Sequence, residues 1–138
     1  MRRDAREAVY RRLYSYFLTG EADGETKDYF YKEHKLTEKD VAFADSLFFA
    51  VFENEKSTVE EINDLTATYG ADRLNYLDKA ALYVGITEIR FFDDIDYAVS
   101  VDEAVRLVKK YSTENSLSFV NGVLAEVVRR KKDECKTD

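Results

Sequence analysis

Three aspartates lie close together in the stretch FFDDIDYAVS, and carboxylates at this density could bind a divalent cation. Asp93, Asp94 and Asp96 lack the regular spacing and the central glycine of a calcium-binding loop. The sequence also contains no phosphate-binding glycine loop, no nucleophile elbow and no HExxH motif. We therefore expect these acids to form a solvated helix end or turn, and we expect no metal, no cofactor and no enzymatic activity.

The chain has one cysteine and one histidine, and both are common ligands of zinc. Cys135 lies in the polar segment KKDECKTD, and His34 has no second imidazole or thiol near it in the sequence. A structural zinc site typically needs four such ligands, so the sequence offers no basis for one. His34 is expected to be a solvated residue between two helices.

Arginines are concentrated at the start of the chain. Arg2, Arg3 and Arg6 precede and open a helical segment, and planar guanidinium groups with several donors suit phosphates. The other interpretation is that these are solvated basic residues near a chain end. Tyr14 follows about two turns later, where an exposed ring could stack on an unpaired base. With ten tyrosines in the chain, a core or rim position is the commoner role for any one of them.

A second polar cluster precedes the last predicted helix, in the stretch KKYSTENSLSFVNGVLAEVVRR. Phe119 in the first turn could pack inward or offer a stacking face, and the pattern favours packing. Gly122 interrupts the apolar run, at a cost to the helix of roughly 1 kcal/mol. The small side chains of the cluster can cap this helix, whose free backbone N–H groups favour an anion such as a phosphate. They are Ser112, Thr113, Asn115, Ser116 and Ser118.

The elements that must position these side chains are all predicted to be helices. Apolar residues recur at helical spacing along most of the 138 residues, and no proline is present to break a helix. Six or seven helices are expected, in an all-α fold with one domain over residues 1–138 and a disordered tail from about residue 131. The apolar segment 72–92 is the predicted central helix, and Gly85 within it suggests a close approach by another helix.

Several residues have the types and spacing of helix ends. Gly20 is predicted to end the first helix, and Gly70 the helix that begins at Ser57. Three pairs have the spacing of a capping box, in which a Ser or Thr is followed three positions later by an acid. They are Thr37 with Asp40, Ser57 with Glu60, and Ser100 with Glu103.

Charge is distributed unevenly along the chain, which has a net charge of −7. Residues 1–12 contain five arginines against two acids, whereas residues 21–64 contain five lysines against 13 acids. Such a chain is not a general nucleic-acid binder, but it leaves room for a small basic edge on an acidic body. No segment has the length of a membrane span or the features of a secretory signal, so we expect no membrane contact and a cytoplasmic location.

Three blocks of the sequence resemble the NusB family of transcription antitermination factors. The segment RRDAREAVYRRLYSYFLTG is similar to the N-terminal signature of the family, and LDKAALYVGITEI is similar to its central helix. The closing segment VDEAVRLVKKYSTENSLSFVNGVLAEV is the most specific of the three. The blocks occur in the family's order, and the region from about 21 to 70 matches only in helical character.

This resemblance implies a compact all-α fold of two small helical bundles and no enzymatic activity. It also implies a role in processive antitermination during ribosomal RNA transcription. Family members bind the single-stranded boxA element of the nascent RNA together with the small-subunit ribosomal protein NusE, which then engages RNA polymerase. Proteins of this kind are RNA-binding transcription regulators.

The positions that match the family's motifs take its binding roles as expectations. RNA binding is implied for Arg2, Arg3, Arg6, Tyr14, Lys79, Asn115, Ser116 and Phe119, and partner binding for Asp78 and Tyr14. Three positions depart from the family pattern. Asp4 stands where many members have a basic residue, Asn115 where an acid is common, and Ser118 where a lysine is frequent. Affinity for RNA or the preferred RNA sequence could therefore differ from that of relatives.

Gly122 carries a structural expectation of its own. A glycine inside a helix permits close approach of a neighbouring element. We expect Gly122 to let the last helix pack tightly against a neighbour. The polar turn before that helix would then be held beside the arginine arm, which is the group Arg2, Arg3 and Arg6.

Two hypotheses about function stay open from the sequence. The first is an RNA-binding antitermination factor that acts with NusE. The second is a helical protein-interaction or dimerisation module of the same fold, with weak or lost RNA binding, which the negative net charge allows. The sequence does not decide between a monomer and a homodimer.

Overall fold

The computed structural model describes residues 1–67 and 74–136, which form helices joined by short connections. Seven helices lie in these residues, which confirms the all-α prediction and its expected number of helices. Across these two ranges, no helix combines the length and the apolar character needed to cross a bilayer. The helices are α1 (Arg2–Thr19), α2 (Gly24–Glu33), α3 (Glu38–Glu53), α4 (Glu55–Thr66), α5 (Tyr76–Phe91), α6 (Tyr97–Tyr111) and α7 (Glu114–Lys136).

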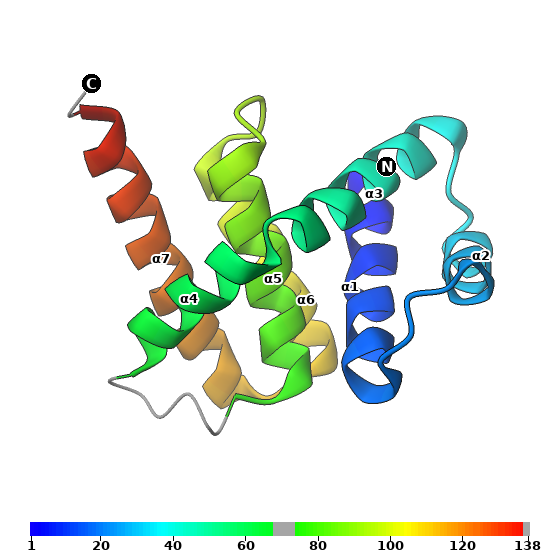
Figure 1. Ribbon diagram of the computed structural model, residues 1–138, viewed down its shortest axis with the longest axis horizontal. Helices are drawn as coiled ribbons and strands as arrows, with labels where there is room; N and C mark the ends of the chain where they lie inside the picture. Colours follow the sequence, from blue (N-terminus) through cyan, green and yellow to red (C-terminus); the bar gives the residue numbers. More distant parts are fainter. Residues whose placement is uncertain (68–73, 137–138) are drawn as a thin grey trace.

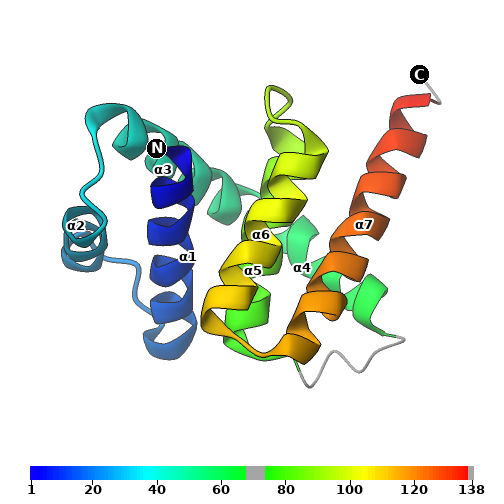
Figure 2. The same ribbon diagram turned by 180° about the vertical axis from the view of Figure 1, so that it is seen from behind.

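The helices form two bundles that meet at α5 (Figures 1 and 2). In one bundle α1 packs against α2 and α3, and in the other α4, α6 and α7 pack around α5. Because α1 and α3 also contact α5, one apolar core runs through both bundles. Every residue from Ala80 to Ile89 is buried, which confirms the prediction that this helix is central.

The two helical glycines in the C-terminal bundle have opposite environments. A Cβ atom on Gly85 would lie 2.8 Å from Leu124 Cδ1 and 3.4 Å from Ala104 Cβ, so α6 and α7 approach α5 closely at this point. The prediction for Gly85 is therefore confirmed. Gly122 is exposed, and a Cβ there would meet nothing within 4 Å. The expectation that Gly122 mediates close packing was wrong, because the inward face of α7 is formed by its neighbours Val123 and Leu124.

One of the three predicted capping boxes caps a helix. Thr37 accepts from the backbone N–H of Asp40, and the Asp40 carboxylate accepts from the backbone N–H of Thr37, as predicted. The predictions for Ser57 and Ser100 were wrong, since α4 begins after Asn54 and α6 begins after Asp96. The Ser-x-x-Glu spacing also places two residues on one face of a continuing helix. Gly20 ends α1 with a φ of 77°, as predicted, and Gly70 lies outside the described residues.

The three clustered aspartates lie where α5 gives way to α6. Asp93 and Asp94 occupy an exposed turn, and Asp96 is the residue that precedes α6, in agreement with the predicted solvated turn. Among residues 1–67 and 74–136, no group of three or more His, Cys, Asp or Glu side chains converges as a metal site would require.

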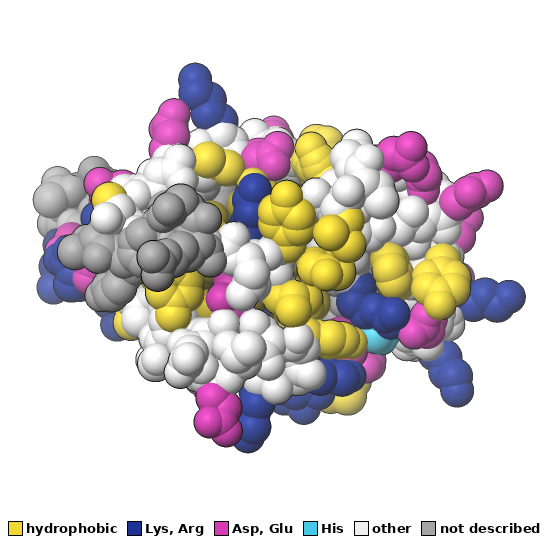
Figure 3. Space-filling view, turned by 90° about the horizontal axis from the view of Figure 1, so that it is seen from below, with side chains coloured by type: hydrophobic (Ala, Val, Ile, Leu, Met, Phe, Trp, Pro, Cys, Tyr) yellow, Lys and Arg dark blue, Asp and Glu magenta, His cyan; other side chains and the backbone are white. Residues whose placement is uncertain are grey.

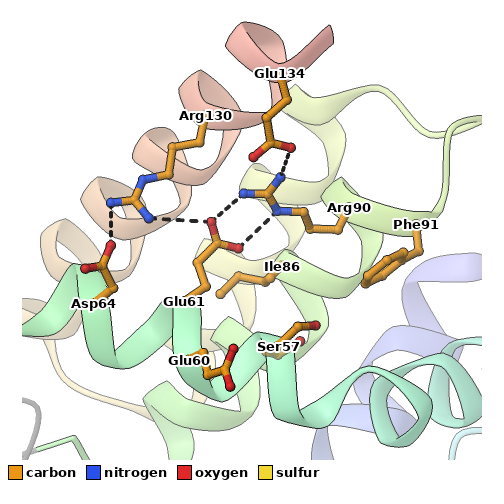
Figure 4. A pocket seen from close by; sticks show the side chains of 10 residues that line it. Ser57, Glu60, Glu61, Asp64, Ile86, Arg90, Phe91, Arg130 and Glu134 are labelled. Atoms are coloured by element: carbon orange, nitrogen blue, oxygen red, sulfur yellow. Dashed lines mark hydrogen bonds and ion pairs between the residues drawn. The ribbon is translucent and has the colours of Figure 1, made fainter.

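An ion-pair cluster joins α4, α5 and α7 along a cleft of about 490 Å³ (Figure 4). Arg90 of α5 donates to Glu61 of α4 at 3.0 Å and to Glu134 of α7 at 2.6 Å. Arg130 of α7 pairs with Asp64 of α4 at 2.7 Å. The sequence predicts disorder from about residue 131, whereas the structure continues α7 as a helix to Lys136, and its Glu134 belongs to this cluster.

Candidate nucleic-acid interface

Arg2 and Arg3 present their guanidinium groups at the first turn of α1. Their side chains are about half exposed, and each lies beside an acid. Arg3 donates twice to Glu103 of α6, at 3.0 and 3.2 Å, and Arg2 lies 3.5 Å from Asp94. The Asp94 side chain is 67% exposed and that of Glu103 is 12% exposed. An exposed ion pair such as Arg2–Asp94 contributes only about 0–1 kcal/mol. Both arginines are therefore held in place, and Arg2 in particular could exchange its carboxylate for a phosphate at little cost.

Arg6, the third member of the arginine arm, lies inside the protein. Its side chain is 5% exposed, and its Nε donates to Glu88 at 2.6 Å. The other oxygen of Glu88 accepts from Ser100 at 2.9 Å. The guanidinium is enclosed between α1, α5 and α6. This burial disfavours contact with RNA, and the expected role of Arg6 in RNA binding stays a prediction. The ion pair of Arg6 with Glu88 holds α1, which carries Arg2 and Arg3, against α5.

Asp78 is the centre of a polar cluster at the start of α5. Its carboxylate accepts from Ser116 at 2.7 Å, from Ser112 at 3.0 Å and from the side-chain amide of Asn75 at 3.2 Å. Asp78 and Ser116 are both buried. Burial disfavours contact of Asp78 with a partner and of Ser116 with RNA, and both roles stay predictions. Both residues instead hold the turn between α6 and α7 against α5.

The members of the predicted site that are exposed or half-buried lie near this anchored turn. Asn115 is exposed, while Tyr14 and Lys79 are half-buried. Lys79 Nζ lies 4.6 Å from the centre of the Phe17 ring, an arrangement that positions the ammonium group. Phe119 is half-buried and packs against the core, as the pattern favours. On this end of the molecule, hydrophobic side chains gather with Lys and Arg side chains beside them (Figure 3).

The arginine arm and the polar turn lie at opposite ends of the molecule. The N-terminus of α1 and the connection from α6 to α7 are far apart in both ribbon views (Figures 1 and 2). The 18 residues of α1 span about 27 Å at about 1.5 Å per residue. The expectation that the polar turn lies beside the arginine arm was therefore wrong. Any strand that touches both must follow the length of α1 and α6.

A network between α1 and α6 connects these two ends, and sequence reasoning did not find it. The buried carboxylate of Glu7 accepts from Lys110 at 2.6 Å and from the hydroxyl of Tyr111 at 2.7 Å. Lys110 is 53% exposed on the side chain, so a cation remains on this face. The residues lie 103 positions apart in the chain, and no local pattern signals such a pair.

The Glu7 network predicts a dependence of stability on pH. Burial acts most strongly and raises the pKa of Glu7, but the hydrogen bonds from Lys110 and Tyr111 together bring it below its ordinary value of 4.5. A lowered pKa in the folded state stabilises the protein above pH 4.5, and this contribution is lost as the pH falls through the folded pKa. We expect Glu7→Gln to flatten the fall in unfolding free energy below about pH 5.

Denaturant unfolding of the parent and the variant at pH 3 to 7 measures this effect. Glu21→Gln serves as the control, since Glu21 is exposed on the turn after α1. It should leave the slope against pH unchanged. A Glu7→Gln profile parallel to that of the parent would contradict the assigned role of the carboxylate.

Sequence comparisons match the chain to NusB proteins. A family model described as the NusB family matches residues 3–129. The transcription antitermination protein NusB of Finegoldia magna is 33% identical over 132 residues, which cover 96% of each chain. The protein of the same name from Methylacidiphilum infernorum is 35% identical over 130 residues, which cover 93% of this chain and 90% of the relative.

Solved structures agree with this placement. The fold matches T. maritima NusB with a TM-score of 0.82 at 27% identity, over 94% of this chain and 91% of that one. It also matches a chain in the crystal structure of the antitermination factors NusB and NusE in complex with double-stranded RNA. That match has a TM-score of 0.78 at 30% identity, over 94% of this chain and 96% of the other. The chain therefore belongs to the NusB family of transcription antitermination proteins.

Proposed function

We propose that this protein binds single-stranded boxA-like RNA of ribosomal RNA transcripts together with the ribosomal protein NusE. The assembly acts in the cytoplasm and couples the RNA to the RNA polymerase elongation complex. The similarity to a NusB chain in a complex with NusE and RNA supports both partners. The RNA of that complex is double-stranded, so the test below includes both forms of RNA.

The observation that carries the proposal is the composition of the face along α1 and α6. Arg2 and Arg3 present half-exposed guanidinium groups at one end, and Lys110, near the C-terminal end of α6, is paired with Glu7 of α1. Asn115 and Tyr14 lie at the other end, beside a turn that Asp78 anchors. Cations spaced along a path with aromatic rings suit a single strand, whose bases are free to stack.

The negative net charge supports the protein partner. Few cations on the RNA face give modest, salt-sensitive RNA binding, and the acidic remainder favours a basic partner through complementary fields. A basic ribosomal protein bound beside the RNA adds positive charge, so RNA should bind more tightly to the pair. Equal RNA affinity with and without NusE would contradict this arrangement.

The double variant Arg2→Ala, Arg3→Ala tests the RNA face. We expect weaker binding of a single-stranded boxA-like oligonucleotide, because two phosphate contacts are lost. The slope of log K against log salt should fall in magnitude by about 1.4, at about 0.7 for each contact with a single strand. Fluorescence anisotropy at several salt concentrations measures both quantities, with a double-stranded RNA of the same sequence in parallel.

The matched control removes two cations elsewhere. Arg129 and Lys132 lie on the exposed side of α7 near its C-terminal end, so Arg129→Ala, Lys132→Ala should leave the slope unchanged. Arg6 stays in place in all variants, since it is part of the core. Equal slopes for all three proteins would favour the second hypothesis, a protein-interaction or dimerisation module. Size-exclusion chromatography of the free protein then decides between a monomer and a homodimer.

A further inference from the structure

A pocket of about 300 Å³ lies between α1, α2, α5 and α6, at the end of the molecule opposite Arg2 and Arg3. We call it the tyrosine pocket, because Tyr10, Tyr14 and Tyr111 line it together with Phe30, Arg11 and Leu77. Its volume is at the lower end of the range of roughly 300–1,000 Å³ that is usual for small-molecule sites. None of the lining residues except Tyr14 belongs to the predicted RNA site.

The walls of the tyrosine pocket are positioned by contacts outside it. The hydroxyl of Tyr111 donates to Glu7 at 2.7 Å, which orients its ring, and the rings of Tyr10 and Tyr111 lie 5.4 Å apart. The Arg11 guanidinium lies 4.7 Å from the centre of the Phe30 ring and donates to Glu33 at 2.6 Å. Aromatic faces and one cation, held before any ligand arrives, are suited to stacking on a planar ring.

Tyr10 adds a specific hydrogen-bonding group. It is 1% exposed, and within the described part of the chain its buried hydroxyl has no hydrogen-bond partner. Burial raises the pKa of this hydroxyl, so it remains a donor at neutral pH. A buried donor without an acceptor is destabilising. An aliphatic side chain from a protein partner could not satisfy it, whereas a ring nitrogen or carbonyl oxygen of a nucleobase could.

The pocket also adjoins the anchored turn. Leu77 precedes Asp78 in the chain, and Tyr111 precedes Ser112, which donates to Asp78. A strand that passes Asn115 and Lys79 would therefore run past the opening. Its backbone would stay on the surface while one base turns inward.

We propose that the tyrosine pocket binds one unstacked nucleobase of the RNA, which stacks on the half-buried rings of Tyr14 and Tyr111 and accepts a hydrogen bond from the hydroxyl of Tyr10. This inference rests on the proposed RNA binding and adds a defined base site to it. It predicts one position in the RNA where the base itself matters more than the phosphates around it.

An abasic scan of a single-stranded boxA-like oligonucleotide tests the proposal, with NusE present. Each nucleotide in turn is replaced by an abasic sugar, and affinity is measured by anisotropy. We expect one position where the loss is roughly 5- to 100-fold, as for a lost stacked base. Tyr10→Phe should weaken intact RNA roughly 2- to 10-fold, as for one lost hydrogen bond. It should have no further effect on RNA that is abasic at that position.

A second variant and a control separate base binding from folding. Ser15→Phe places a ring in the pocket from its half-buried rim and should reproduce the loss seen with the abasic RNA. Tyr83→Phe removes an equally buried hydroxyl, bonded to Glu55 at 3.1 Å outside the pocket, and should leave RNA affinity unchanged. Circular dichroism confirms that each variant is folded.

The outcomes distinguish this inference from the proposed function. RNA binding by the parent with no dominant abasic position, or with additive effects of Tyr10→Phe and the abasic site, overturns the base pocket and leaves the proposed function intact. Weakened NusE binding by Ser15→Phe without any change in RNA affinity assigns the pocket to the protein partner and also overturns it. No RNA binding by the parent overturns both.

Discussion

Arg6→Ala is expected to lower the free energy of unfolding by about 3–5 kcal/mol, the usual cost of leaving one charge of a buried ion pair unpaired. Glu88 is 1% exposed and, among the residues that the structure describes, would keep only the donor from Ser100. The loss is large because a carboxylate enclosed between α1, α5 and α6 cannot recover its hydration. Denaturant unfolding followed by circular dichroism measures it.

The control is Arg3→Ala on the same helix. Arg3 is 50% exposed and its partner Glu103 is 12% exposed, whereas Arg6 and Glu88 are 5% and 1% exposed. The carboxylate that Arg3→Ala leaves unpaired keeps some contact with water, so the unfolding free energy should fall by less than with Arg6→Ala. Replacing both charges, as in Arg6→Met with Glu88→Leu, should recover much of the stability because no unpaired charge remains. If Arg6→Ala and Arg3→Ala had equal effects, the buried pair would not be a determinant of stability.

Gly85→Val is the second change with a large expected effect, and it should lower the free energy of unfolding by roughly 1–3 kcal/mol. Even the Cβ atom would lie 2.8 and 2.9 Å from the two methyl carbons of Leu124, which is itself fully buried in the core. Valine adds two further carbons to a Cβ atom that α6 and α7 already crowd, so neighbouring side chains must shift. Thermal or denaturant unfolding gives the difference.

Gly122→Ala is the matched control in the same bundle. An added methyl group meets nothing within 4 Å at this exposed position, and alanine favours a helix over glycine by roughly 0.5–1 kcal/mol. We expect a small gain in unfolding free energy. A loss at Gly122 as large as that at Gly85 would contradict the close approach of α7 to α5 at Gly85.

Because Arg6 is buried, a test of RNA binding should leave it in place. A variant that replaces Arg2, Arg3 and Arg6 together would lose RNA through unfolding as well as through lost contacts. The double variant of Arg2 and Arg3 isolates the contacts. Neither interpretation of the arginines made from sequence anticipated the burial of Arg6, whereas Arg2 and Arg3 lie on the surface, as both interpretations require.

Some helix ends could be predicted from neighbouring residues alone, and others could not. The boundary signals at Gly20 and Thr37 were interpreted correctly, because a left-handed glycine and a reciprocal capping box depend on neighbouring residues only. Ser100 and Glu103 have the same spacing as Thr37 and Asp40, yet they lie inside α6. Their side chains bind Glu88 and Arg3 from other helices, and no local pattern distinguishes these two uses of one spacing.

The sequence by itself determined the all-α fold, the central helix and the family, because helical periodicity and each sequence motif are carried by residues close in the chain. Only the tertiary structure decided which motif residues reach the surface. Arg6, Asp78 and Ser116 are buried, and Arg2, Arg3 and Asn115 are not. Burial depends on partners such as Glu88, which lies 82 positions from Arg6, and such contacts exist only after the helices have packed.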